Sequence, residues 1–426
     1  MKTSIQGVKG ARDFYPEDMA VRQWLYRAIR RVSESYGYQE WDGPFLEKID
    51  LYAAKSGEEL VNQQSFVFTD RGGEPITLRP ELTPSLARMV AQRQAELVFP
   101  LRWWSFGPFW RYERPQKGRS REFFQWNIDM IGVNTPESDA ELVAVAAAFL
   151  REVGLSPQQV KIYINDRRLT NQTLAELGVA EALRPEALHL IDRQNKMAPE
   201  AWEANAIELG LTPNQLDGLK LSLVDEDLWK KSAPLQRIFS MLDCLGVRDY
   251  VSYDAHIIRG LDYYTAVVFE AFDVDGGRSI LGGGHYDNLV SDVGGDPLPA
   301  VGFAMGDMMI SVTLQKYGLA PKVGSMPDTV LATVFDEALF PASYRLAAEL
   351  RQSGIKAVAY PELAKLPRQL KFADRMGILI AVIVGPDEQA SRQVVVKDLA
   401  RRTQQTVPYA ETAGTILQLL AKAQAQ

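Results

Sequence analysis

The sequence predicts an α+β protein with an antiparallel-sheet core, a helical insertion and a small C-terminal α/β domain. Residues 102–132 alternate between two faces with a period of two residues, as a strand does. Residues 165–250 are mostly helical in pattern, whereas strands and helices alternate after residue 328, as in small parallel or mixed α/β domains. We expect a core of residues 1–164 and 251–320, an insertion of residues 165–250, and a C-terminal domain of residues 328–421.

The bulk composition is that of an ordinary globular protein. The chain has 426 residues, of which 46% are hydrophobic and 24% charged, and it is long enough to bury a sizeable core. A net charge of −7 argues against a broadly basic surface, although a local basic patch can still bind nucleic acid. The single cysteine, Cys244, excludes an internal disulfide and a cysteine zinc site, and three widely spaced histidines make no convincing metal site.

Nothing in the sequence directs the chain to a membrane. The start of the chain lacks the apolar run of a signal peptide. No apolar stretch is long enough to span a bilayer. We therefore expect a cytoplasmic protein that does not engage a membrane.

The N-terminal region predicts a helix followed by a strand. Apolar residues between Val21 and Tyr36 recur at spacings of three and four, and Gly37 suits the end of that helix. Residues 38–47 then read as a strand that is interrupted at Pro44. A proline at that point belongs on a sheet edge or at a bulge.

Two strands joined by a loop are expected between Trp103 and Gly132. The loop, residues 113–120, is basic and contains proline and glycine, as a hairpin connection should. One face of the second strand is apolar and should pack on the core, through Phe124, Trp126, Ile128 and Met130. The other face carries Gln125, Asn127 and Asp129. Periodicity alone favours solvent exposure for these three polar residues, and a pocket floor is the alternative.

Two clusters of basic residues contrast with the acidic average. Between residues 101 and 125, six arginines and lysines face two glutamates. A second cluster consists of Lys365, Arg368, Lys371 and Arg375, opposed by Asp374. Such clusters are usually solvated faces, so they indicate nucleic-acid binding only when something else supports it.

Helix-end signals recur further along the chain. Thr135 and Pro136 suit the N-cap and the first turn of a helix that runs to about Gly154. Gly178 and Gly246 suit the ends of two later helices. Further strands are expected near residues 264–272 and 300–305, then at 329–335, 356–360, 378–384 and 393–399, with C-terminal helices at 342–354 and 366–377.

Two segments stand out, residues 109–125 and residues 259–264, Arg-Gly-Leu-Asp-Tyr-Tyr. The first resembles motif 2 of the histidyl-tRNA synthetase family of class II synthetases, and the second resembles that family's own histidine signature. Residues 281–287, Leu-Gly-Gly-Gly-His-Tyr-Asp, resemble its second signature, and residues 78–83 match its Arg-Pro-Glu-x-Thr segment. The N-terminal helix and the strand at Pro44 resemble class II motif 1, which implies a homodimer.

This resemblance covers essentially the whole chain. It implies a class II synthetase antiparallel-sheet catalytic core and a C-terminal α/β anticodon-binding domain. It also implies ATP-dependent activation of L-histidine and its transfer to tRNA(His), with Mg²⁺ accompanying ATP.

The resemblance assigns catalysis to Arg259 and Arg111, which would flank the α-phosphate of ATP and the carboxylate of histidine. Charge accumulates on the phosphoryl oxygens during activation, and a guanidinium that binds two oxygens at once stabilises it. It assigns ATP binding to Arg111, Glu113 and Arg119. It assigns histidine binding to Glu81, Thr83, Arg111, Gln125, Asp129, Arg259, Tyr263 and Tyr264. It assigns tRNA binding to Arg114, Gln116, Arg368 and Lys371.

The sequence departs from the family pattern at four positions. Met309 stands where motif 3 of class II enzymes ends in an arginine that lies on ATP, and Asp307 replaces an apolar residue. His285 stands where the second signature usually has arginine. Asp129 stands where many relatives have glutamate, which is a milder change.

These departures leave a second interpretation open. Some paralogues keep the synthetase fold without catalysis, such as the regulatory subunit of ATP phosphoribosyltransferase, but they generally lack the anticodon-binding domain. If the chain is an enzyme, Arg114 and Lys117 of the basic loop are the nearest candidates to replace the charge missing at Met309. A third interpretation, an ATP-using ligase without an RNA partner, explains neither the basic loop nor the C-terminal domain.

Overall fold

The chain forms two compact units, residues 1–13 with 25–320 and residues 14–24 with 321–426. The structure, a computed structural model, describes residues 5–53, 64–116, 118–259, 263–321, 326 and 328–424. Helix α1 (Pro16–Ser35) runs across the division between the units. Within the described ranges, no helix combines the length and apolar character that a membrane crossing requires.

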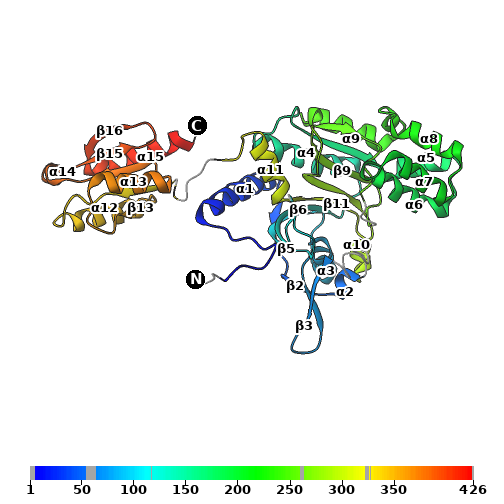
Figure 1. Cartoon of the computed structure of the whole chain (residues 1–426), viewed down its shortest axis with the longest axis horizontal. Coiled ribbons are helices and arrows are strands. Elements are labelled where there is room, and N and C mark those ends of the chain that lie inside the picture. The colour runs from blue at the N-terminus through cyan, green and yellow to red at the C-terminus, as the bar shows by residue number, and fades with distance from the viewer. Residues whose placement is uncertain are drawn as a thin grey trace. The chain divides into compact units, whose positions relative to one another are not determined.

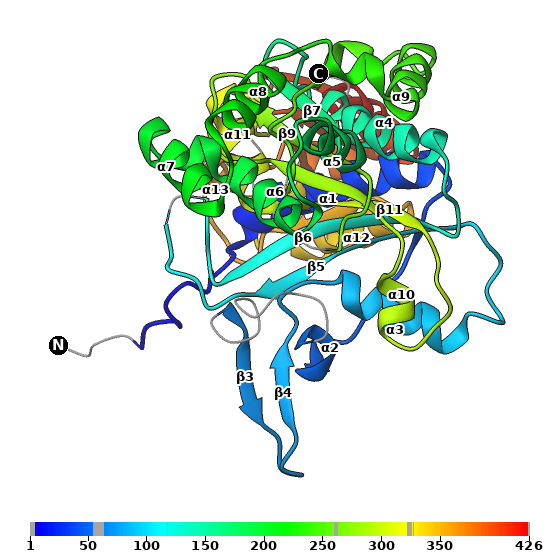
Figure 2. The same ribbon diagram turned by 90° about the vertical axis from the view of Figure 1, so that its right-hand side faces the viewer.

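An eight-stranded sheet forms the centre of the first unit (Figures 1 and 2). In order across the sheet, its strands are β1 (Gln39–Glu40), β5 (Leu101–Trp110), β6 (Glu122–Ile131), β11 (Ala300–Gly306), β10 (Leu281–Tyr286), β9 (Val267–Asp273), β7 (Val160–Asp166) and β8 (Val251–Tyr253). Neighbouring strands are antiparallel except in the two outer pairs, β1–β5 and β7–β8. The expected α+β class with an antiparallel core is therefore confirmed.

The apolar face of β6 packs against helix α4 (Pro136–Glu152). The Trp126 ring is fully buried, and its centroid lies 5.2 Å from that of Phe149 on α4 and 4.8 Å from that of Phe303 on β11. Thr135 caps α4 as expected, because its side chain accepts a hydrogen bond from the backbone N–H of Ser138. One side of the sheet is thus closed by a helix, and the other side is left for the polar residues of β6.

The segment expected as a strand interrupted at Pro44, residues 38–47, forms two strands in two different sheets. Its first part is β1 in the large sheet, whereas β2 (Leu46–Lys48) joins a separate sheet with β4 (Pro75–Leu78) and β3 (Phe66–Thr69). Pro44 lies between β1 and β2, because it cannot donate to either ladder. Figures 1 and 2 show β3 projecting away from the large sheet. Short helices of this unit are α2 (Asp50–Ala53), α3 (Thr83–Arg93), α10 (Leu289–Asp292) and α11 (Asp307–Lys316).

Helices fill most of the chain between β7 and β8. They are α5 (Arg167–Glu176), α6 (Arg184–Arg193), α7 (Pro199–Leu209), α8 (Pro213–Leu223) and α9 (Ala233–Cys244). Helices α5 to α8 enclose a core of their own around the buried Trp202 (Figure 1). Gly178 and Gly246 end α5 and α9 with positive φ angles, as their positions in the sequence predict. Because β7 and β8 are parallel neighbours, this helical segment is the crossover that joins them.

The second unit is a small mixed α/β domain, as expected. Its five strands lie in the order β13 (Lys356–Ala359), β12 (Thr329–Ala332), β14 (Ile380–Ile383), β15 (Gln393–Asp398) and β16 (Thr403–Pro408). The first three are parallel and the last three antiparallel. Helices α12 (Phe340–Gln352) and α15 (Thr412–Gln424) cover one face, α13 (Leu366–Met376) covers the other, and α14 (Pro386–Ser391) joins β14 to β15. The pattern along the chain did not indicate β16 or α15.

A buried ion network holds β10, the strand that contains the glycine-rich signature. His285 is 1% exposed, and its Nδ1 and Nε2 lie 2.9 Å from Asp139 Oδ1 and 3.2 Å from Asp287 Oδ1. Burial opposes the charged imidazolium, but the two carboxylates outweigh it and raise the pKa of His285 above its ordinary value. The raised pKa favours a charged imidazolium where the family usually has arginine.

We predict a pH-dependent contribution of His285 to stability. Because its pKa is raised in the folded state, the stabilisation is fully present below the unfolded pKa of about 6.5 and is lost as pH rises through the folded pKa. Urea unfolding from about pH 6 to 9 should show the free energy of unfolding falling more steeply for the parent than for His285→Gln. Parallel curves for the two proteins would show that folding does not raise the pKa of His285.

Candidate active site

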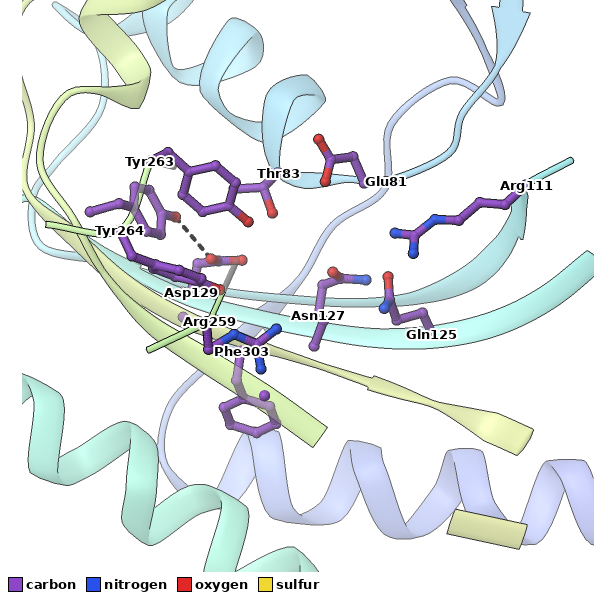
Figure 3. Close-up of a pocket in the computed structure, with 14 residues that line it drawn as sticks. Glu81, Thr83, Arg111, Gln125, Asn127, Asp129, Arg259, Tyr263, Tyr264 and Phe303 are labelled. Carbon is purple, nitrogen blue, oxygen red and sulfur yellow. Dashed lines mark hydrogen bonds between the residues drawn. The ribbon is translucent and has the colours of Figure 1, made fainter. Parts of the chain in front are cut away.

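A cavity of about 230 Å³ opens on the face of the large sheet opposite α4. All eight residues that the sequence assigns to histidine binding line it, although they come from four separate segments of the chain (Figure 3). The remaining lining residues are Asn127, Gly282, Tyr286, Gly302, Phe303 and Ala304. The volume suits a ligand smaller than a drug-sized molecule.

The floor of the cavity is the polar face of β6. Gln125, Asn127 and Asp129 rise from this strand side by side, opposite Tyr263, Thr83 and Glu81 (Figure 3). The solvent-exposed interpretation that periodicity favoured is therefore wrong, since Asn127 is 4% and Asp129 5% exposed. Periodicity identifies a face but cannot tell what covers it.

Two glycines make room for the charged side chains of the site. A Cβ on Gly282 would lie 1.4 Å from Arg259 Nη1, and a Cβ on Gly302 would lie 2.0 Å from Asp129 Oδ1. The β6–β11 register sets Gly302 directly opposite Asp129. The glycine-rich segment is thus a strand, β10, whose missing side chains let Arg259 lie across it. The sequence pattern did not indicate that strand.

Asp129 is buried beneath the tyrosines of the cavity. Burial raises its pKa to about 7, although the Tyr286 hydroxyl, which donates to Oδ1 at 2.8 Å, opposes that rise. The Tyr263 ring lies 4.7 Å from Tyr264 and 5.9 Å from Tyr286. A carboxyl group that can gain or lose its proton near neutral pH can hydrogen-bond either a donor or an acceptor on a ligand.

Arg259 is held in place by Glu270. Its Nη1 donates to Glu270 Oε1 at 2.6 Å, and its guanidinium lies 5.6 Å from the centre of the Tyr264 ring. Burial opposes the charge, but Glu270 raises the pKa of Arg259, so the side chain stays cationic. The backbone of Arg259 has a φ of 57°, which is uncommon for a residue other than glycine. The next three residues of the signature, 260–262, lie outside the described residues.

Arg111 joins this cavity to a second one. Its Nε donates to the carbonyl of Pro80 at 2.9 Å, and its guanidinium lies 5.3 Å from the centre of the Phe123 ring. It lines both the first cavity and a neighbouring cavity of about 140 Å³. The second cavity also contains Glu113 and Arg119, which pair at 3.3 Å. The three residues assigned to ATP are therefore brought together beside the residues assigned to histidine.

The motif 3 departures lie at the edge of the second cavity. Asp307 accepts a hydrogen bond from the backbone N–H of Phe124 at 2.9 Å and pairs with Arg12 at 2.7 Å. Its charge is thus used to tie the start of α11 to β6 and to the N-terminal segment. Met308 and Met309 line the second cavity. Within the described part of the loop, Arg114 does not line this cavity, and Lys117 lies outside the described residues.

The residues assigned to tRNA lie on exposed surfaces of both units. Arg114 and Gln116 are exposed on the loop between β5 and β6. Arg368 and Lys371 are exposed on α13, where the buried Gln369 holds the helix to the end of β12. Gln369 accepts from the Val334 N–H at 2.9 Å and donates to the Val334 carbonyl at 2.7 Å. This anchor fixes which side of α13 faces solvent.

Sequence reasoning missed Asn127 as a site residue. Its Nδ2 is buried, lines the cavity and has no hydrogen-bond partner within the described residues. A buried donor without a partner costs free energy, so a ligand acceptor is expected to meet it. The signal was available, because Asn127 lies two residues from both Gln125 and Asp129 on the same face of the strand.

The arrangement suits the joining of a small zwitterion to a nucleotide. One cavity presents carboxyl, amide and hydroxyl groups for a polar side chain and an ammonium group. The other presents the Arg119 guanidinium and Glu113. Arg111, and on the other side Arg259, lie where two anionic groups would have to be brought together.

Comparisons with known proteins identify the family to which the chain belongs. The family model described as histidyl-tRNA synthetase matches residues 10–309, and that of an anticodon binding domain matches residues 327–419. The histidine–tRNA ligase of Leptospira biflexa is 35% identical over 99% of both chains, and that of Haloarcula marismortui is 36% identical over 96% of both. The chloroplastic/mitochondrial histidine–tRNA ligase of Arabidopsis thaliana is 37% identical over 94% of this chain and 84% of its own.

Solved structures show the same fold. Histidyl-tRNA synthetase from Nostoc is 24% identical, with a TM-score of 0.86 over 98% of this chain and 100% of its own. A Bacillus halodurans protein described as an ATP phosphoribosyltransferase regulatory subunit/histidyl-tRNA synthetase has a TM-score of 0.72 over 90% of this chain and 100% of its own, at 22% identity. These two likenesses concern the fold alone, whereas the catalytic-domain family model covers most of the chain and the relatives cover nearly all of it. The chain belongs to the histidyl-tRNA synthetase family.

Proposed function

We propose that this chain activates L-histidine with ATP and transfers the activated histidine to tRNA(His). In the first step a histidine carboxylate oxygen attacks the α-phosphorus of ATP, and the bond to the departing pyrophosphate breaks. In the second step a ribose hydroxyl at the end of the tRNA attacks the acyl carbon, and AMP leaves. The observation that carries the proposal is the junction of the two cavities at Arg111, with Arg259 across the first cavity.

Each wall of the first cavity has a proposed role in that reaction. Gln125 and Asp129 bind the imidazole, together with Tyr263 and Tyr264, while Glu81 and Thr83 bind the ammonium group. An apolar analogue would leave these buried groups unpaired, which is the strongest basis for rejecting it. Arg111 and Arg259 stabilise the charge that develops between carboxylate and α-phosphate. In the second cavity Glu113 and Arg119 hold the nucleotide.

Magnesium is proposed to enter with ATP rather than to reside in the protein. No cluster of three metal-ligating side chains occurs within the described ranges, and Glu113 is the carboxylate of the second cavity. Mg²⁺ commonly takes one or two carboxylates together with substrate phosphates. When bound, it would neutralise part of the charge on the triphosphate.

The non-catalytic regulatory interpretation has no observation in its favour. The relatives match over nearly the full length, and the anticodon-binding domain is present. We propose a cytoplasmic homodimer on the basis of family membership. Histidine-dependent ATP–pyrophosphate exchange by the purified protein, followed by charging of tRNA(His), tests the whole proposal. Exchange that does not depend on histidine, or none at all, would reject it.

Replacing Arg259 should impair the chemical step more than substrate binding. Arg259→Ala is expected to lower the rate of pyrophosphate exchange by roughly a hundredfold or more, with a much smaller change in histidine affinity, because the guanidinium acts mainly on transition-state charge. Arg193→Ala, at an exposed position on α6, is the matched control. Exchange at the parental rate by Arg259→Ala would remove the catalytic role.

Replacing Gln125 should weaken histidine specifically. Gln125→Leu removes a polar partner from the cavity floor, so histidine affinity should fall by about 1–3 kcal/mol while ATP affinity changes little. The same change at the exposed Gln172 is the control. A histidine titration that superimposes on that of the parent would place Gln125 outside the recognition set.

The surface of α13 should affect tRNA charging but not histidine activation. Arg368→Ala combined with Lys371→Ala should raise the KM for tRNA(His), and the salt dependence of binding should weaken by about one unit of log–log slope for each phosphate that the protein no longer neutralises. Pyrophosphate exchange should be unaffected. Arg402→Ala, also exposed on this unit, is the control, and an equal effect from it would show that α13 is not the tRNA-binding surface.

A further inference from the structure

The second cavity lacks the cation that motif 3 supplies in class II enzymes. Met309 lines this cavity at that position, and its sulfur lies 2.6 Å from the point where a Cβ on Gly118 would be. Gly118 belongs to the loop between β5 and β6 and also lines the cavity. An apolar thioether therefore fills the space against this loop, and a triphosphate bound there needs its positive charge from another side chain.

Arg278 lies beside the same glycine. Its Cδ is 3.9 Å from the position of a Cβ on Gly118, on the side of the loop that Met309 also touches. The two residues that follow it, Ser279 and Ile280, line the second cavity. The connection between β9 and β10 therefore brings the Arg278 side chain to this loop, beside the cavity, although Arg278 itself is not among the lining residues.

The guanidinium of Arg278 is incompletely paired. Its Nη1 is buried and has no hydrogen-bond partner within the described residues, although the side chain as a whole is only partly buried. A buried charged donor without an acceptor costs several times what an ordinary hydrogen bond contributes. A phosphate group bound to this guanidinium would remove that cost and accept two N–H bonds at once.

The two arginines that line the cavity already make contacts. Arg119 pairs with Glu113, and Arg111 donates through its Nε to the Pro80 carbonyl. Arg278 lies just behind this lining, next to Gly118 and Ser279, and its Nη1 has no acceptor within the described ranges. The sequence pattern pointed instead to Arg114 and Lys117, because they are neighbours of motif 2 along the chain, whereas Arg278 is brought there by the fold.

We propose that Arg278 binds the outer phosphates of ATP in place of the arginine that Met309 replaces. This inference rests on the proposed function, since it assigns the second cavity to ATP. Arg278 is thus a substrate-binding residue, and the β9–β10 connection, rather than α11, supplies this positive charge.

The test compares ATP with AMP on the full-length protein by calorimetry. Arg278→Met, a change to an apolar side chain of similar length, should weaken ATP by about tenfold or more and leave AMP within about twofold, because AMP lacks the outer phosphates. Arg278→Lys should lose less than Arg278→Met. Adding Met309→Arg to Arg278→Met should restore most of the ATP affinity. Arg193→Met is the matched surface control.

Three results would overturn the inference. One is ATP affinity unchanged in a folded Arg278→Met protein, even if its stability falls, which would make Arg278 structural. The second is an equal loss for ATP and AMP, and the third is no ATP binding by the parent. A parent that binds ATP and responds to Arg278→Met but shows no histidine-dependent exchange would reject the proposed function and leave the inference standing.

Discussion

The alternation of side chains along β6 is the constraint on which the site depends. A strand in the middle of an antiparallel sheet has two faces, and here both are covered. Trp126 faces α4, whereas its neighbours Gln125 and Asn127 face the cavity. A shift of one residue in register would exchange these faces, placing amides in the core and an indole in the site. Ten paired positions with β5 and seven with β11 hold the register. The same register therefore decides which side chains fill the core and which line the site.

Two of the departures from the family pattern introduce ionisable residues that have partners elsewhere in the chain. Asp307 is a buried carboxylate in place of an apolar residue, and it is offset by Arg12 and by the backbone of Phe124. His285 stands for an arginine, and its contacts with Asp139 and Asp287 favour its charged form. A buried ion is tolerated only with its partners, so each substitution requires the matching residue elsewhere in the chain. These ion pairs join residues far apart in the sequence, so a single motif does not reveal them.

The sequence was most informative where the signal is local. The Thr135 cap, the glycine ends at Gly178 and Gly246, and the two-faced pattern of β6 all follow from short-range chemistry. The sequence was least informative about a strand face whose exposure depends on which element packs against it. Whether Asp129 faced solvent or a cavity depended on β11 and the tyrosines above it, and only the resemblance favoured the cavity. The glycine-rich strand β10 carries no pattern of its own, because close approach by Arg259 and by the neighbouring strands requires the absence of side chains.

The position of Arg111 limits how the proposed reaction can proceed. It lines both cavities, so a ligand group that reaches it from the first must meet a ligand group that reaches it from the second. Its Nε donates to the Pro80 carbonyl, which fixes one edge of the guanidinium. Arg79 is buried close by, where its Nε donates to the Pro108 carbonyl and its Nη1 pairs with Asp42. The segment that carries Pro80 and Glu81 is thus tied to β5 on both sides, and the guanidinium of Arg111 is oriented before any substrate arrives. Preorganisation of this kind lowers the barrier because no reorientation accompanies the build-up of charge.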